Sequence, residues 1–312
     1  MAGFCVRIAG LSIRVVPDDP ALRLSPDPSL LAFRHDSAAA DVTVNVRWTD
    51  IAGHPGGVPL FDSGGVWRLF GEPGRLTFSF ATGSRARPYK TASFDCGFHQ
   101  GLILLNRLEL DALSPVDPLE YPLDELLVVH MLSRGRGVEV HAAGVVDSDG
   151  RGFLCVGESG AGKSTLARIW LEFPGIEILS DDRVILRRDG DHIAMHGTPW
   201  HGEGRLVSNR GARLAGVFFL RQASSNSLTA EPPVLAAAHL FARAFPPFYD
   251  ASAIESTLGF LDAVCTRVPA FELGFVPDAS VVDFLRRQPL GQREPPSLRT
   301  RPATAACRNG QS

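Results

Sequence analysis

The segment from Gly157 to Ser164 constrains the fold of this chain more than any other part of the sequence. It reads Gly-Glu-Ser-Gly-Ala-Gly-Lys-Ser, a complete G-x-x-x-x-G-K-[ST] match, between an apolar run at 153–156 and a helical pattern at 164–171. Glycines let such a loop curl until successive N–H groups point at phosphate oxygens, and the following helix adds the positive end of its dipole. The sequence therefore predicts an α/β layer with a phosphate-binding loop at a strand end.

The residues of this loop have distinct expected roles. The Lys163 ammonium is expected to reach the β- and γ-phosphates of ATP, and the Ser164 hydroxyl is expected in the coordination shell of Mg²⁺. The alternative is a glycine-rich turn that binds no ligand. The predicted nucleotide-binding residues are Gly157, Glu158, Ser159, Gly160, Ala161, Gly162, Lys163, Ser164 and Thr165.

A pair of acids follows the next predicted strand. Asp181 and Asp182 come after the apolar run 176–179 and precede Arg183. A carboxylate at such a strand end faces the phosphate loop and binds Mg²⁺, and a neighbouring acid can act on the attacking group. Asp181 is therefore the expected Mg²⁺ ligand together with Ser164, and Asp182 is the expected general base. The alternative is a solvated turn in which one acid pairs with Arg183.

Two further residues are candidates for the reaction. His141 ends a short strand pattern, and Arg210 could stabilise charge on a transferring phosphoryl group. A lone histidine is usually structural, and most arginines of an arginine-rich chain lie at the surface, so both residues keep a structural alternative. The turn at 198–204, with His196 before it, lacks metal-ligand spacing and is expected to be a polar surface loop.

Taken together, these motifs resemble the HPr kinase/phosphorylase and phosphoenolpyruvate carboxykinase-like P-loop family over about residues 138–220. That family has a strand with His and small residues, a second strand, a G-x-S-G-x-G-K-S loop, a helix, and an Asp-Asp pair before Arg. The same order occurs here from His141 to Arg183. The resemblance implies a P-loop kinase core with His141 near the base. Thr165 replaces a Glu common in the bifunctional enzymes, and Arg210-Gly211 matches their signature only loosely, so the chain looks closer to HPr kinase-like relatives.

The chain is expected to divide into three parts. Short β-prone runs between Gly, Pro, Asp and Ser clusters predict an antiparallel β-rich domain of unknown role at 1–115. Residues 116–287 are expected to form the P-loop kinase-like α/β domain, and residues 288–312, with few apolar side chains, a disordered tail. The predicted strands lie at 42–48, 66–70, 76–80, 90–94, 102–105, 138–146, 153–156, 176–179 and 217–220, and the predicted helices at 122–132, 164–171, 233–244, 251–265 and 281–287.

Composition argues against several other classes of protein. A net charge of −3 at pH 7 provides no basic field for a nucleic acid or an anionic membrane. The apolar runs are shorter than the ~18 residues of a membrane-spanning helix, and the N-terminus lacks a signal-peptide pattern, so a cytoplasmic location is expected. The 5 cysteines contain no C-x-x-C pair, which argues against a disulfide framework or a zinc cluster. The oligomeric state stays open and includes a homo-oligomer.

Two functions compete at this point. An ATP- and Mg²⁺-dependent kinase would transfer the γ-phosphoryl group to a hydroxyl of a protein, a peptide or a small molecule. A nucleotide-driven ATPase switch would use hydrolysis to reset a conformation while the β-rich region binds a partner. The acid pair favours the kinase, because transfer to a hydroxyl requires a group that accepts its proton.

Overall fold

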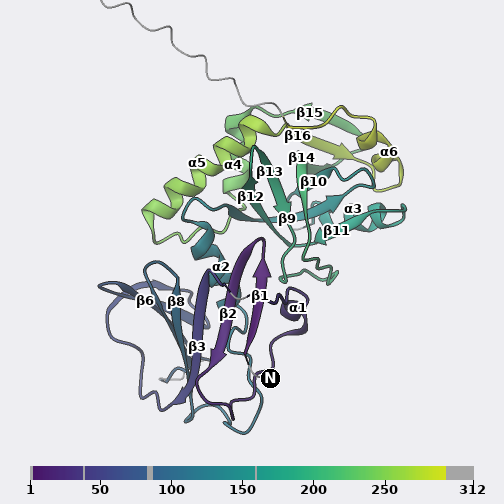
Figure 1. The fold of residues 1–312 in the computed structure, drawn as a ribbon. Coiled ribbons are helices and arrows are strands. Elements are labelled where there is room, and N and C mark those ends of the chain that lie inside the picture. Colours follow the sequence, from purple (N-terminus) through teal and green to yellow (C-terminus); the bar gives the residue numbers. More distant parts are fainter. Residues whose placement is uncertain (1–2, 38, 83–86, 159, 293–312) are drawn as a thin grey trace, which may run out of the picture.

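The protein has two lobes, each built on one large β-sheet (Figure 1). This computed structural model describes residues 3–37, 39–82, 87–158 and 160–292. The first sheet and most of the helices lie in different lobes, and helix α2 lies at the junction (Figure 1). The predicted mixed α/β class is confirmed.

The first sheet has the strand order β1-β2-β3-β8-β7-β6-β5-β4. Strand β3 is parallel to both β2 and β8, so the prediction of an antiparallel region is wrong at these two pairings. The reason is the connectivity: the chain leaves β3 for the far edge of the sheet and returns as an antiparallel meander. The elements are β1 (Phe4–Ile8), β2 (Leu11–Pro17), α1 (Pro28–Leu31), β3 (Val42–Thr49), β4 (Val58–Asp62), β5 (Trp67–Glu72), β6 (Arg75–Phe80), β7 (Lys90–Asp95) and β8 (Gln100–Asn106).

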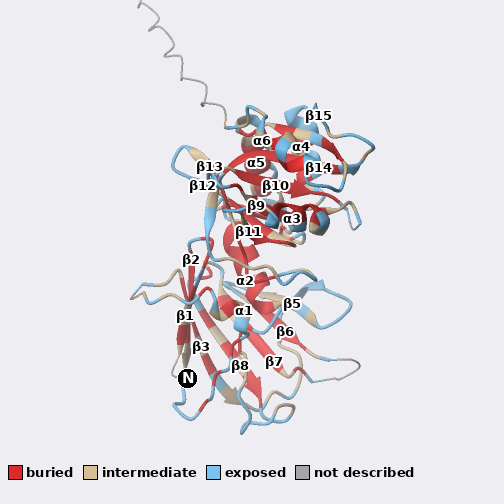
Figure 2. Cartoon of the chain, turned by 90° about the vertical axis from the view of Figure 1, so that its right-hand side faces the viewer, coloured by how far each residue is buried: buried red, intermediate tan, exposed pale blue. Residues whose placement is uncertain are grey.

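Helix α2 (Leu123–Leu132) belongs to the core of the first sheet. Its side chains Leu127, Val128, Met131 and Leu132 are buried among the apolar strand residues of this lobe. The helix is coloured as buried where the two lobes meet (Figure 2). Helix α2 falls within the domain predicted at 116–287, but it packs in the core of the first sheet.

In the second sheet, each of two long strands pairs with several other strands along its length. Strand β9 pairs with β12 through residues 138–141 and with β10 through residues 142–146. Strand β14 pairs antiparallel with β13 and parallel with β10 and β16. The elements are β9 (Val138–Val146), β10 (Gly152–Val156), α3 (Lys163–Leu171), β11 (Glu177–Ser180), β12 (Arg183–Asp189), β13 (His192–His196), β14 (Gly211–Gln222), β15 (Ser227–Ala230), α4 (Pro233–Phe241), α5 (Ala251–Arg267), β16 (Ala270–Phe275) and α6 (Ser280–Arg286).

Helices cover both faces of this sheet around β10. Leu154 and Val156 point into a core that includes α4 and α5, whereas Phe153 and Cys155 point into a core that includes α3 and α6. This alternation is the period of two that a strand buried on both faces imposes. It fixes the end of β10 between two helical layers, and the glycine-rich loop starts there.

Residues 288–292, which composition assigns to a disordered tail, are tied to the second sheet. The Gln292 side chain donates to the carbonyl oxygens of Ile193 and Leu214, at 2.6 and 2.8 Å, and accepts from the Ile193 N–H at 2.9 Å. Residues 293–312 lie outside the described part of the chain. Within that part, none of the helices combines the length and the apolar character needed to cross a membrane.

Candidate functional site

The glycine-rich loop joins the carboxyl end of β10 to the first residue of α3. Gly160 and Gly162 have φ angles of 82° and 103°, a region of backbone conformation that residues other than glycine rarely adopt. A Cβ atom on Gly162 would also lie 2.7 Å from the ring of Phe275 on β16. Both the backbone and the neighbouring ring therefore require glycine at position 162.

Lys163 folds back over this loop. Its Nζ donates to the carbonyl oxygen of Gly157 at 2.7 Å and to that of Glu158 at 3.2 Å. Burial lowers the pKa of Lys163, and the nearby charge of Asp182 opposes this effect. The ammonium is thus held inside the loop and close to one acid of the pair.

The remaining loop residues differ in exposure. Glu158 and Thr165 are exposed, Ala161 and Ser164 are half-buried, and the Ala161 N–H donates to the Glu158 carbonyl oxygen at 3.1 Å. Ser159 lies outside the described residues. Ser164 lies in the first turn of α3, where the helix dipole favours a bound anion.

Asp182 and His141 are in contact, and the charge of Asp182 acts on Lys163. The Nδ1 atom of His141 lies 3.1 Å from Oδ1 of Asp182, because His141 of β9 pairs in register with Arg183 at the start of β12. Burial alone would raise the pKa of Asp182, but the hydrogen bond with His141 and the charges of Arg183 and Lys163 lower it overall. Asp182 is therefore ionised at neutral pH and can accept a proton.

Asp181 points elsewhere and organises a loop. Its Oδ1 accepts from the N–H of Gly202 at 2.9 Å, and its Oδ2 accepts from the N–H of Gly204 at 2.8 Å. The residue is 4% exposed. The turn that holds Gly202 and Gly204 also differs from the expected polar surface loop, because Thr198 and Trp200 in it are buried. The Mg²⁺ role of Asp181 stays a prediction.

The predicted residue Arg210 does not join this cluster. Its guanidinium is exposed and lies 2.8 Å from Oε2 of Glu177, the first residue of β11. Asp181 follows the last residue of the same strand, about four residues from Glu177. The acid pair therefore lies at the opposite end of β11 from Arg210.

Arg243 is a residue of the site that the sequence analysis missed. Its carbonyl oxygen accepts the N–H of His141 at 2.8 Å, and its guanidinium lies 3.7 Å from Oε1 of Glu158. The charge of Arg243 also lowers the pKa of Lys163. This effect is smaller than that of burial, and the charge of Asp182 opposes both. The buried Nε of Arg243 has no hydrogen-bond partner among the described residues. No local pattern marks Arg243 in the sequence, since a β-bridge between Val140 and Ala244 brings this residue to the loop.

Arg183 connects Asp182 to the first lobe. Its Nε lies 2.9 Å from Oε1 of Glu125 on α2 and 3.4 Å from Oε1 of Glu139 on β9, and its NH1 donates to Asp182. The guanidinium also stacks over the ring of Phe245, 4.3 Å from its centre. Three carboxyl groups, from helix α2, strand β9 and the turn before β12, thus share one cation.

Glu139 is the most deeply buried of these carboxyl groups. Its side chain is 0% exposed, and neither oxygen has a hydrogen-bond partner within the described residues. Burial raises its pKa well above the usual value, and the charge of Glu125 raises it further, against the opposing effect of Arg183. Glu139 therefore holds a proton more readily than an ordinary glutamate.

The oxygen atoms at this site suit an Mg²⁺ ion that takes only one or two of its ligands from the protein. The described residues include no group of three or more His, Cys, Asp or Glu side chains arranged to hold a metal. Mg²⁺ bound with a nucleotide needs only one or two protein ligands, because phosphates and water complete its shell. The hydroxyl of Ser164 and a carboxylate of the acid pair are hard oxygen ligands of this kind.

Replacing Asp181 by Asn is expected to destabilise the protein. An amide can accept from only one of the Gly202 and Gly204 N–H groups, and its NH₂ then faces the other donor. The free energy of unfolding should fall by about 1.5–3 kcal/mol, the usual contribution of a hydrogen bond to a charged group. Urea denaturation measures this loss, with the exposed Asp191→Asn as the control. Equal stability of Asp181→Asn and the wild type would show that these contacts do not hold the loop.

Replacing Glu139 by Gln should change how stability depends on pH. Because the pKa of Glu139 is raised in the folded state, the wild type binds more protons than the unfolded chain and loses stability as pH rises above the usual glutamate range. The amide in Glu139→Gln does not titrate, so the stability of this variant relative to the wild type should increase by about 1 kcal/mol or more between about pH 5 and about pH 8. Denaturation at both pH values tests this, with the exposed Glu255→Gln as a control. A pH-independent difference would contradict the raised pKa.

Comparison with known proteins shows a weak structural likeness and no likeness in sequence. No protein-family model matches the chain, and no curated protein matches it. A similar solved structure is that of the Hpr(Ser) kinase/phosphatase from Coxiella burnetii, with 14% sequence identity and a TM-score of 0.29. The match covers 48% of this chain and 93% of that chain. A likeness of this size establishes no family.

Proposed function

We propose that this protein is an ATP- and Mg²⁺-dependent phosphotransferase of the HPr kinase-like type, which transfers the γ-phosphoryl group to a hydroxyl. The observation that carries the proposal is the position of Asp182, which contacts His141 and lies close enough to Lys163 for the two charges to act on each other. A phosphate group held by the loop would lie next to an ionised carboxylate. That combination suits transfer to a hydroxyl, because the acceptor must lose a proton.

The loop and its neighbours would hold the nucleotide. The backbone N–H groups of the loop and the N-terminus of α3 would bind phosphate oxygens, and Lys163 would move from the loop carbonyls to the β- and γ-phosphates. Arg243, with its unpartnered Nε, would add a second cation near the γ-phosphoryl group. Mg²⁺, when bound, would neutralise phosphate charge, with Ser164 and Asp181 as its proposed protein ligands. For this role Asp181 would use the remaining lone pairs of a carboxylate that also accepts the N–H groups of Gly202 and Gly204.

In the proposed transfer, Asp182 takes the proton of the acceptor hydroxyl. The acceptor oxygen forms a bond to the γ-phosphorus while the bond from that phosphorus to the oxygen of the ADP leaving group breaks. The proton of the hydroxyl moves to the carboxylate of Asp182, which His141 and Arg183 hold in place. An ATPase switch would use water in place of the acceptor, and the two functions differ in whether a phosphate ester forms.

Lys163→Ala should weaken binding of ATP·Mg²⁺ and leave the fold intact. Removing the ammonium removes a charge-assisted contact to the phosphates, equivalent to a loss of about ten- to a hundredfold in affinity. Calorimetry measures the affinity and circular dichroism the fold. The control is Arg168→Ala, an exposed cation on the same helix. Wild-type affinity in Lys163→Ala would exclude the loop as the phosphate site.

Asp182→Asn should bind ATP·Mg²⁺ nearly as well as the wild type and transfer the phosphoryl group far more slowly. The amide cannot accept the acceptor proton as a base, so single-turnover transfer should fall by ~10²–10⁴-fold. The matched control is Asp191→Asn, an exposed acid in the turn between β12 and β13. Transfer at the wild-type rate in Asp182→Asn would refute the base. A selective loss of Mg²⁺ dependence would instead exchange the roles of Asp181 and Asp182.

A further inference from the structure

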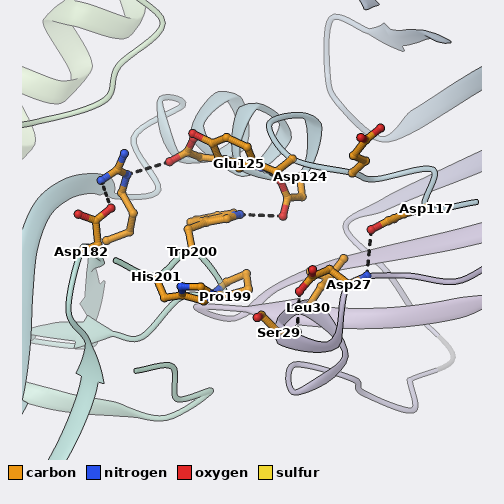
Figure 3. A pocket seen from close by; sticks show the side chains of 13 residues that line it. Asp27, Ser29, Leu30, Asp117, Asp124, Glu125, Asp182, Pro199, Trp200 and His201 are labelled. Atoms are coloured by element: carbon orange, nitrogen blue, oxygen red, sulfur yellow. Dashed lines mark hydrogen bonds and ion pairs between the residues drawn. The ribbon is translucent and has the colours of Figure 1, made fainter. Parts of the chain in front are cut away.

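A cavity of about 330 Å³ lies between the two lobes, and Asp182 forms part of its wall. In Figure 3, Asp182 lies at one end of this pocket and Asp27 and Asp117 lie at the other, with Trp200 between them. The volume is at the lower end of the range for small-molecule sites, so it fits one small molecule or two side chains. The pocket therefore opens onto the residue that the proposed reaction uses as its base.

Both lobes contribute to the walls of this pocket. The first lobe supplies the start of α1, the segment that leads into α2 and the first turn of α2, and the second lobe supplies Asp182, Arg183 and the loop that Asp181 holds. Trp200 of that loop is fixed across the junction, because its Nε1 donates to Oδ2 of Asp124 at 2.7 Å. The pocket is thus a feature of the assembled chain rather than of either lobe alone.

The charge of the pocket is strongly negative. Arg183 is the one lysine or arginine among the described residues that line it, and Glu125, Glu139 and Asp182 already surround that guanidinium. At the far end, Glu120 is ion-paired with the buried Lys90, 3.5 Å away, whereas Asp27 and Asp117 have no lysine or arginine of the described residues within ion-pair distance. The lining carboxyl groups are Asp27, Asp117, Glu120, Asp124, Glu125 and Asp182.

Two further features of the pocket suit a positively charged ligand. Burial raises the pKa of Asp124 to about 7, so this carboxyl group is partly protonated near neutral pH and a bound cation would favour its ionised form. The wall also includes the indole of Trp200 and the largely exposed ring of Tyr121. Aromatic faces attract ammonium and guanidinium groups.

We propose that this pocket binds the phosphoryl acceptor, and that the acceptor carries an ammonium or guanidinium group at the end remote from its hydroxyl. The hydroxyl lies at Asp182, and the cation lies toward Asp27 and Asp117. A serine beside a lysine or arginine in a peptide has this chemistry, and so has a small amino alcohol. The inference rests on the proposed function, since it is the transfer reaction that gives Asp182 an acceptor.

The test compares ligands matched in size and different in charge, with the full chain and a non-hydrolysable ATP analogue plus Mg²⁺. The peptide arm uses acetyl-Ser-Lys-amide, acetyl-Ser-norleucine-amide and acetyl-Ser-Glu-amide. The small-molecule arm uses 5-amino-1-pentanol and 1-pentanol. Binding is followed by ligand-observed NMR, and nucleotide binding is measured separately by calorimetry. In at least one arm, the cationic probe should bind about tenfold or more tightly than its neutral partner.

Variants then locate the cation. Asp27→Asn and Asp117→Asn, alone and together, should remove most of the preference for the cationic probe; Asn keeps the ability to cap α1. The control pair is Asp262→Asn with Glu255→Gln, two exposed acids on α5 that carry the same change in charge. The control should keep the preference unchanged.

Each contrary result has a distinct meaning. Equal binding of all probes, or none, in protein that binds the ATP analogue would overturn the pocket assignment and leave the proposed function standing. A preference that survives in folded Asp27→Asn/Asp117→Asn protein would place the cation elsewhere and also overturn it. Failure of the wild type to bind the ATP analogue would refute the proposed function, and with it the assignment of the pocket to an acceptor.

Discussion

The arrangement of the site depends on one half-buried cation, the guanidinium of Arg183. It contacts Asp182 next to it in the chain, Glu139 on β9 and Glu125 on α2. Burying a charge is costly unless partners compensate for it, so these elements are held in one relative position by the need to satisfy Arg183. Because α2 packs in the core of the first sheet, the same cation ties that core to the proposed base. A change in the first lobe can thus reach Asp182 through two contacts.

Strand β9 brings the other parts of the site to this cation. It pairs with β12 along its first half and with β10 along its second half, so it lies between the acid pair and the strand that leads into the glycine-rich loop. Glu139 and His141, two residues apart, lie on the same side of the strand, since side chains alternate. Strand β9 therefore places a carboxyl group on Arg183 and an imidazole on Asp182.

Local patterns predicted much of this structure, and long-range pairings account for what they missed. Strands β9, β10 and helix α3 were predicted nearly to the residue, because their apolar periodicity and the glycine-rich loop are read from adjacent residues. Strands β12 and β13 were missed, since polar residues such as Arg187 and Asp189 interrupt their apolar runs. Neither Arg243 nor the pocket between the lobes has a local signal in the sequence. A bridge from Ala244 to Val140 brings Arg243 to the site, and the docking of α2 creates the pocket.

The most direct measurement of the central claim follows the γ-phosphate of ATP. The full chain is incubated with γ-labelled ATP, Mg²⁺ and fractionated extract of the source cell, and the labelled products are separated into phosphate esters and inorganic phosphate. The account predicts label in a stable ester of a hydroxyl, with the labelled acceptor carrying a positive charge. Label found only as inorganic phosphate would contradict phosphoryl transfer and would establish an ATPase instead.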